Sequence, residues 1–338
     1  MGSYERCKPP AVGGEGVSRE EMKRTARMLV EHCVALRPGE HVLVVGDTTT
    51  AEIADVLAEA AREGGGDVVL AIMEPRAQHG NDPPKVLAAA MLASDVMLMA
   101  VKHSITHTTA RKEASARGAR AVVLRSVTVE SMTQGAATAD YPAIRRLTKQ
   151  IAEVLTRGTV VHVTSPEGTD LRIRIEERSA LALDGFATEP GTFTPFPTGE
   201  AAIVPVEASA EGLVVFDHAI DNVGVLDAPI RCEVRGGRIV RVDGGRSAEV
   251  FRTLIATDAN AGNIAEFAIG TNPKSRLRGN MAEDKVLLGV VHIGVGDSHT
   301  IGGLIESRIH VDAIILNPTV EVDGARIVDR RKMLVEVR

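Results

Sequence analysis

The segment VHIGVGDSHTIGGLIESRIHVD (residues 291–312) combines imidazole and carboxylate groups, the side chains that bind divalent metals. Three of the chain's ten histidines lie in it. At its end, His310 and Asp312 are separated by a single residue. Residues i and i+2 of a strand face the same side, so both side chains could reach one metal ion. The pair alone is also explained by an aspartate that holds a structural histidine through a hydrogen bond.

The other two histidines of this segment lie in different surroundings. His292 is in an apolar run, where a lone histidine is more often a core residue, but its small neighbours leave room beside it. His299 lies in the glycine-rich stretch GDSHTIGG, where it suits general acid–base chemistry better than rigid ligation. These glycines do not form G-x-G-x-x-G and no strand-to-helix unit follows, so we expect no nucleotide cofactor.

Two glutamates, Glu200 in FPTGEAAIVP and Glu266 in GNIAEFAIGTNP, stand at the edges of apolar segments. A carboxylate in such a place must be paired, protonated or bound to a cation, although cap or turn chemistry explains either one alone. With His292, His310 and Asp312 they form a set of three carboxylates and two imidazoles. That set suits one or two divalent ions (Zn, Mn, Co or Fe), which make hydroxide from bound water and polarise a carbonyl group.

The N-terminal half is expected to supply a substrate-binding edge. Buried strands separated by helical segments predict a doubly wound parallel sheet, with strands at residues 41–47, 67–73, 95–101 and 119–124. His103 and His107 follow the third strand, at the carboxyl edge where such folds bind ligands. We therefore expect both histidines to face the substrate.

From about residue 159 the hydrophobic period changes from that of helices to that of strands. Hairpins are expected over 159–176, turned at PEGT, and over 230–242, turned at Gly236-Gly237. A helix over 247–259 and strands over 285–296 and 308–316 follow. The predicted fold is thus an α/β N-terminal domain with a doubly wound parallel sheet, then a β-rich mixed α+β C-terminal domain that binds metal. The expected boundaries are a disordered N-terminus at 1–16, the α/β domain at 17–158 and the catalytic domain at 159–338.

Composition excludes several classes of partner. The chain has 338 residues, 2 % aromatic residues and no Trp, so it offers few rings on which bases could stack. Its formal charge of −6 gives no basic surface for a phosphate backbone. No apolar run approaches a membrane span, and the three cysteines are too far apart for a CxxC pair. We expect a cytoplasmic protein with a small-molecule substrate and with neither nucleic acid nor membrane as a partner.

Taken together, NIAEFAIGTNP, VVHIGVG, TIGG and IHVD followed by VDG resemble the aminopeptidase T family of cobalt- or zinc-dependent peptidases. FPTGEAAIVP resembles the upstream Gly-Glu segment of that family. The resemblance implies a homodimer in which two metal ions per chain are held by Glu200, Glu266, His292, His310 and Asp312.

The chain departs from that family at His299, which stands where the peptidases carry a tyrosine thought to be catalytic, and it looks shorter. With SITHTTAR, these features resemble a divergent branch that includes the 2,5-dihydroxypyridine 5,6-dioxygenases. In that branch two histidines and an aspartate hold Fe(II). His310 and Asp312 match, and the second histidine stays unassigned. A histidine near SITHT acts in acid–base chemistry there, which indicates His107.

The expected function is a metal-dependent hydrolase of a small amide, peptide or cyclic amide. In it Glu266 or His299 moves the proton and His107 contacts the substrate. The leading alternative is a non-haem Fe(II) dioxygenase that opens the ring of a hydroxylated pyridine or related N-heterocycle. A binding protein with a vestigial site is a third hypothesis. Oxygen uptake with substrate separates the first two, and product formation excludes the third.

Overall fold

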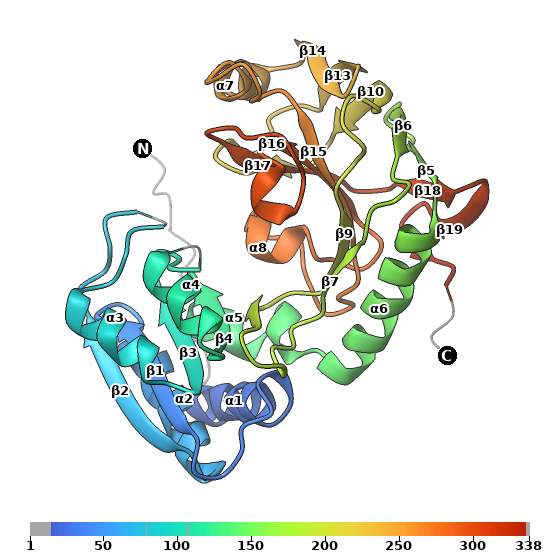
Figure 1. The fold of residues 1–338 in the computed structure, drawn as a ribbon. Helices are drawn as coiled ribbons and strands as arrows, with labels where there is room; N and C mark the ends of the chain where they lie inside the picture. The colour runs from blue at the N-terminus through green and yellow to red at the C-terminus, as the bar shows by residue number, and fades with distance from the viewer. Residues whose placement is uncertain (1–14, 79, 107, 336–338) are drawn as a thin grey trace, which may run out of the picture.

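The computed structural model describes residues 15–78, 80–106 and 108–335, which form one parallel and two antiparallel sheets (Figure 1). The expected disorder over residues 1–16 lies outside this part of the chain, except that Glu15 and Gly16 already belong to the first helix, α1 (Glu15–Met28). The predicted fold class agrees at the level of an α/β half followed by a β-rich half.

The parallel sheet has the strand order β2-β1-β3-β4-β8. The first four strands lie close to the predicted ranges, and their bounds are β1 (His41–Asp47), β2 (Asp67–Met73), β3 (Val96–Val101) and β4 (Arg120–Arg125). Valine, leucine and methionine fill β3 on both faces, as expected for a strand covered on both sides. The fifth strand, β8 (Phe193–Pro195), comes from much later in the chain and pairs in parallel with β4.

Helices cover both faces of this sheet, so it is doubly wound. One apolar cluster joins the sheet to α1, the π-helical turn η1 (Leu29–Cys33) and α2 (Ala51–Glu63). A second cluster on the opposite face joins it to α3 (Lys85–Leu92) and α4 (Thr109–Ala116). Two short helices, α5 (Val129–Thr133) and η2 (Gly135–Thr138), lead into α6 (Tyr141–Arg157).

Helix α6 connects the two halves of the molecule. Its first turns, at Tyr141 and Ile144, are buried in the core of the parallel sheet. Its later residues Leu147, Ile151 and Leu155 are buried in the core of the β-rich half. The apolar face of this one helix therefore contributes to two hydrophobic cores in succession.

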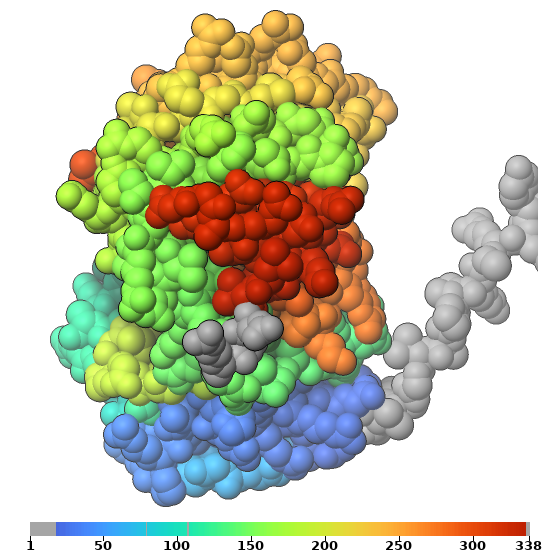
Figure 2. Space-filling model, turned by 90° about the vertical axis from the view of Figure 1, so that its right-hand side faces the viewer, coloured from blue at the N-terminus to red at the C-terminus, as the bar shows by residue number. Residues whose placement is uncertain are grey.

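Two antiparallel sheets pack against each other in the second half and share one apolar core. The eight-stranded sheet contains β5 (Val160–Thr164), β6 (Asp170–Arg174), β10 (Glu211–Phe216), β13 (Ile230–Arg235), β14 (Arg238–Asp243), β18 (Thr319–Val322), β19 (Ala325–Asp329) and β20 (Lys332–Met333). The seven-stranded sheet contains β7 (Leu181–Leu183), β9 (Glu200–Ile203), β11 (Ala219–Ile220), β12 (Gly224–Val225), β15 (Ile264–Gly270), β16 (Val291–Gly296) and β17 (His310–Ile315). In Figure 2 the C-terminal strands (red) lie against the green segments, in agreement with the pairing of β18 with β5.

Both predicted hairpins are confirmed. β5 and β6 pair around PEGT, and β13 and β14 pair around Gly236-Gly237, where both glycines have positive φ (54° and 73°) as a two-residue hairpin turn requires. The helix expected over 247–259 is α7 (Arg246–Ile255). The strand expected over 285–296 is wrong in its first half, because Lys285 directly follows the short helix α8 (Met281–Asp284) and β16 begins only at Val291.

Within the described ranges, no helix has the length and apolar character needed to cross a bilayer.

Candidate metal centre

Four neighbouring strands of the seven-stranded sheet, in the order β9-β15-β16-β17, carry the candidate ligands on one face. The opposite face of these strands is buried in the core shared with the other sheet, through Ala201, Ile203, Phe267, Ile269, Val291, Ile293, Val295, Val311, Ala313 and Ile315. Since alternate residues of a strand point to opposite faces, the residues between them point away from that core. These include Glu200, Glu266, His292, His310 and Asp312.

A β-bulge in β15 turns Glu266 to the ligand face. Ile264 pairs with Val295, whereas Glu266 pairs with Gly294. Two residues of β15 therefore lie opposite one residue of β16. Ile264 lies in the apolar core. In a regular strand Glu266 would point to the same face as Ile264, into the core. The extra residue Ala265 turns Glu266 to the opposite face.

Gly294 provides the space in which the ligand groups meet. It pairs with Glu266 on one side and with Asp312 on the other, at the centre of a row across three strands. A Cβ atom added at Gly294 would lie 2.6 Å from Glu266 Cβ and 3.2 Å from His310 Nε2. A side chain at this position would therefore occupy the space between the ligands.

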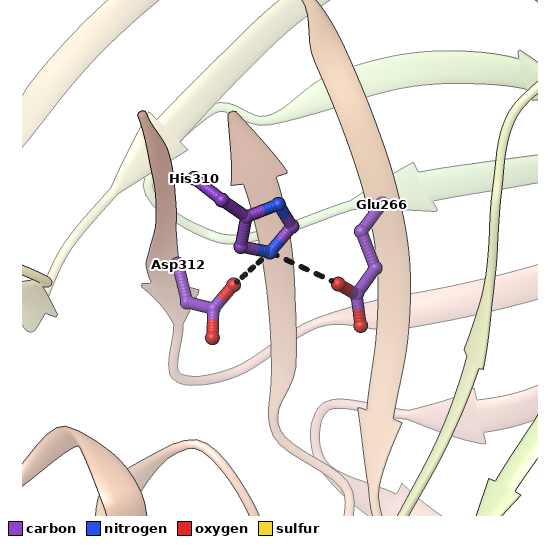
Figure 3. A group of neighbouring side chains, drawn as sticks. All are labelled: Glu266, His310 and Asp312. Carbon is purple, nitrogen blue, oxygen red and sulfur yellow. Dashed lines mark ion pairs between the residues drawn. The ribbon is translucent and has the colours of Figure 1, made fainter. Parts of the chain in front are cut away.

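His310, Glu266 and Asp312 form the tightest part of the site (Figure 3). The Nε2 atom of His310 lies 3.2 Å from Glu266 Oε2 and 3.3 Å from Asp312 Oδ1. One ligand atom from each residue lies within 4.8 Å of the others, which is compatible with coordination of a single ion. Glu266 and Asp312 are buried, and the side chain of His310 is 27 % exposed. The group could therefore hold a metal ion that a substrate can reach.

The other ring nitrogen of His310, Nδ1, forms a hydrogen bond within the protein. Its Nδ1 lies 2.7 Å from the backbone carbonyl oxygen of Asp297, to which it donates a hydrogen bond. That bond leaves the lone pair on Nε2, which faces the two carboxylates. Metal-binding histidines commonly have such a partner, because it fixes the orientation of the ring.

His292 and Glu200 extend the group. The Nε2 atom of His292 lies 3.7 Å from Glu266 Oε1 and 3.8 Å from Glu200 Oε2, and both side chains are buried. Both ring nitrogens of His292, Glu200 Oε2 and Asp312 Oδ1 have no hydrogen-bond partner among the described residues. Buried polar atoms without partners are costly, and a coordinated cation would satisfy them. The donor set thus fits a divalent metal.

Lys285 is a member of the site that sequence reasoning missed. Its Nζ atom lies 3.0 Å from Glu200 Oε1 and 3.0 Å from Asp312 Oδ2. Burial disfavours the ammonium form, but the carboxylates of Asp312, Glu200 and Glu266 outweigh it and hold the pKa of Lys285 above its ordinary value. A lysine that begins an apolar run gave no signal in the sequence, because such residues are usually solvated.

The charges of the group are mutually dependent. Burial opposes ionisation of Glu266 and Asp312, yet the pKa of both carboxyl groups is lowered. For Glu266 the cause is contact with the imidazoles of His292 and His310. For Asp312 it is foremost the charge of Lys285, followed by the two imidazoles. Burial likewise opposes the charged imidazole of His310, but the adjacent carboxylates of Asp312 and Glu266 raise its pKa well above the usual value. The pKa of His292 is also raised. Both imidazoles are therefore more basic than a histidine in water.

Of the three histidines expected to face the substrate, the structure describes His103 and His299. His299 begins the 3₁₀ turn η3 (His299–Ile301) and is exposed, and no described contact joins its ring to the ligands. His103 lies just beyond the end of β3, at the carboxyl edge of the parallel sheet as expected. His107 lies outside the described residues.

Arg125 is a second residue that the sequence did not indicate. It ends β4, at the same carboxyl edge. Burial and the charge of Asp312 raise the pKa of Asp221, and the positive charge of Arg125 opposes that rise. The same charge also opposes the rise in the pKa of Lys285. Asp221 in turn accepts a hydrogen bond from the backbone of Asp312 at 3.4 Å. No described residue forms an ion pair or hydrogen bond with the Arg125 guanidinium. The parallel sheet therefore contributes a cation to the surroundings of the metal group.

Comparison with known proteins places this geometry in a family. Residues 21–335 match the family NicX, described as 2,5-dihydroxypyridine 5,6-dioxygenase. The chain belongs to this family. A curated NicX-type relative, the 2,5-dihydroxypyridine 5,6-dioxygenase of Pseudomonas putida strain KT2440, is 25 % identical over 194 residues. That alignment spans 52 % of this chain and 54 % of the relative, so it covers only about half of the curated protein.

Two solved structures share the fold of this NicX family member. The 2,5-dihydroxypyridine dioxygenase of Pseudomonas putida KT2440 superposes with a TM-score of 0.82 at 19 % identity, over 94 % of this chain and 98 % of that one. AmpT from Thermus thermophilus superposes with a TM-score of 0.74 at 18 % identity, over 94 % and 100 %. The expected resemblance to the dioxygenase branch is confirmed by the family match, and the fold is shared with AmpT. The comparisons favour the dioxygenase alternative over the hydrolase.

Proposed function

We propose that this protein is a non-haem Fe(II) dioxygenase that opens the ring of a hydroxylated pyridine or a related N-heterocycle. The observation that carries the proposal is the family match over residues 21–335, which spans every candidate ligand. A buried group of imidazole and carboxylate ligands supports it. The proposal replaces the hydrolase expected first from the sequence with the alternative stated beside it.

In this proposal Glu266, His310 and Asp312 hold the metal, with His292 beside them as the second imidazole. When bound, Fe(II) supplies the redox chemistry by which dioxygen reacts with an aromatic ring. The protein keeps the ligands in place through the strand ladder and through the hydrogen bond from His310 to the Asp297 carbonyl. Only His310 among these four is substantially exposed, so the substrate approaches the metal from its side of the group.

The substrate side is formed by residues at the carboxyl edge of the parallel sheet and by the glycine-rich loop. We assign a substrate-facing role to His103, His107 and His299, with His107 or His299 moving a proton. The guanidinium of Arg125 suits the anionic oxygen of a hydroxypyridine, because it has no partner of its own among the described residues. The homodimer and the cytoplasmic location stay predictions.

The metallohydrolase is the second candidate function, and one observation favours it. Glu200 and Glu266 both lie in the group in addition to Asp312, although a mononuclear iron site with two histidines and one carboxylate needs only one carboxylate. A two-metal hydrolase would use them as further ligands.

Oxygen uptake decides between the two. Protein purified anaerobically and loaded with Fe(II) is mixed with 2,5-dihydroxypyridine and with other hydroxypyridines in an oxygen-electrode cell. We expect one O₂ consumed per ring lost, and no consumption after chelation or in the His310→Ala variant, which should also have lost its metal. Hydrolysis of amide or peptide substrates without oxygen uptake would instead establish the hydrolase. Full metal content and full rate in His310→Ala would refute the site itself.

A further inference from the structure

Lys285 lies inside the ligand group, where a metal site usually has no cation of its own. Its ammonium is held between Glu200, on β9, and Asp312, on β17, at 3.0 Å from an oxygen of each. Only 15 % of its side chain is exposed. The ion pairs therefore fix a positive charge between two strands that do not pair with each other.

The two oxygens of Asp312 face different cations. Oδ1 lies 3.3 Å from His310 Nε2 and belongs to the group with Glu266, which is the first metal position. Oδ2 faces Lys285. A carboxylate that bridges two cations through its two oxygens is the usual arrangement in dinuclear metal sites. Here an ammonium stands where the second cation would be.

The remaining ligands of a second position are present around Lys285. Glu200 offers Oε1, which pairs with the ammonium, and Oε2, which lies 3.8 Å from His292 Nε2 and has no hydrogen-bond partner among the described residues. An ion at the place of the ammonium would meet one oxygen each from Glu200 and Asp312. A divalent ion bound there would meet the fixed positive charge of Lys285 within a few ångströms, in a buried place where charges are weakly screened.

We propose that Lys285 restricts this site to one metal ion per chain by occupying, with its ammonium, the second cation position between Glu200 and Asp312. The inference rests on the metal-binding part of the proposed function but not on the reaction performed there. It explains why a chain that retains the carboxylates suited to two metals belongs to a dioxygenase family. Lys285 is thus a residue that determines metal number.

The number of bound ions tests this directly. The chelated full-length chain is titrated anaerobically with Co²⁺ or Fe²⁺, and bound metal is counted by native mass spectrometry and elemental analysis. We expect one ion in the natural protein and two in Lys285→Met. Lys274→Met, which removes an exposed lysine eleven positions earlier, is the matched control and should bind one. Lys285→Arg keeps the cation and should also bind one.

Further variants locate the second ion and guard against misfolding. Lys285→Met/Glu200→Gln removes a ligand of the new position and should return the count to one. If Lys285→Met folds only with metal, its melting temperature should rise until two equivalents have been added, and Lys285→Gln should behave in the same way. One ion in folded Lys285→Met, or two in the natural protein, would overturn the inference. Absence of any bound ion in the natural protein would instead refute the metal-dependent function.

Discussion

The Nδ1 atom of His310 lies 2.7 Å from the backbone carbonyl of Asp297, and the carboxylate of the same aspartate organises the loop that carries His299. That carboxylate accepts hydrogen bonds from the backbone and hydroxyl of Thr300 and from the backbone of Ser307. One residue therefore positions both a metal ligand and the loop on which a substrate-facing histidine is proposed.

Replacing Asp297 by Ala should weaken metal binding without removing a ligand. The loop would lose three hydrogen bonds, and the carbonyl that orients His310 would be less well fixed. Loss of such supporting contacts typically lowers metal affinity by about 10- to 100-fold. Isothermal titration with Co²⁺ measures the effect, and Asp243→Ala at an exposed site on β14 serves as the control. Equal affinity in both variants would contradict the supporting role of Asp297.

Gly294→Ala should abolish metal binding while leaving the protein folded. The added Cβ would lie 2.6 Å from Glu266 Cβ and within 3.2 Å of the ligating nitrogen of His310. Overpacking of this kind costs roughly 1–3 kcal/mol of stability, which a domain of this size tolerates. In Gly262→Ala the new Cβ meets nothing closer than 3.4 Å, so this control should retain metal. Metal content and thermal unfolding are measured for both, and a metal-replete Gly294→Ala would show that the ligands meet elsewhere.

Metal affinity should fall as the pH is lowered. The pKa values of His292 and His310 are raised in the metal-free protein, and a metal ion binds only the neutral imidazole. Below these raised values each ring is protonated and competes with the metal, so the affinity should decrease by about tenfold per pH unit for each proton displaced. Above them the affinity should reach a plateau. Titrations across neutral pH in a non-chelating buffer measure the slope, and a flat profile would show that neither imidazole is a ligand.

Arg125→Ala should raise KM for a hydroxypyridine more than it lowers kcat. The Arg125 guanidinium has no partner among the described residues and is available for an anionic substrate oxygen. Loss of such a charged hydrogen bond costs about 1.5–3 kcal/mol, or roughly 10- to 100-fold. Arg125→Lys should recover part of the loss. Initial rates of substrate disappearance give both constants, with Arg146→Ala, an exposed change on α6, as reference. An unchanged KM would exclude Arg125 from substrate binding.

Much of the fold was accessible from sequence because it depends on local patterns. Continuous apolar runs such as VMLMAV predict the buried strands of the parallel sheet, and the two glycines at Gly236-Gly237 predict the hairpin turn. The strand carrying Glu200 was located only as an apolar stretch, and its pairing with β15 was not predicted, because pairing across more than sixty residues leaves no local trace. The pairing of β8 with β4 in the parallel sheet was not predicted for the same reason.

The candidate ligands were accessible because their side chains are unusual for their surroundings. Glu200, Glu266 and His292 stand in apolar segments, and His310 and Asp312 share a face of one strand. Lys285 and Arg125 were missed, since a basic residue next to a helix or at a strand end looks like an ordinary solvated charge. Only the three-dimensional arrangement shows that Lys285 pairs with two of the carboxylates and that the charge of Arg125 acts on the same group.

The bulge at Ala265 gives the metal centre an unusual sensitivity to chain length. Because a single additional residue decides whether the carboxylate of Glu266 points to the ligands or into apolar packing, deletion of that residue would reverse its orientation without changing any ligand's identity. A sequence alignment would score such a deletion as a minor gap beside a fully retained set of ligands. In relatives of this protein, the number of residues between Ile264 and Phe267 is therefore as informative about metal binding as the ligands themselves.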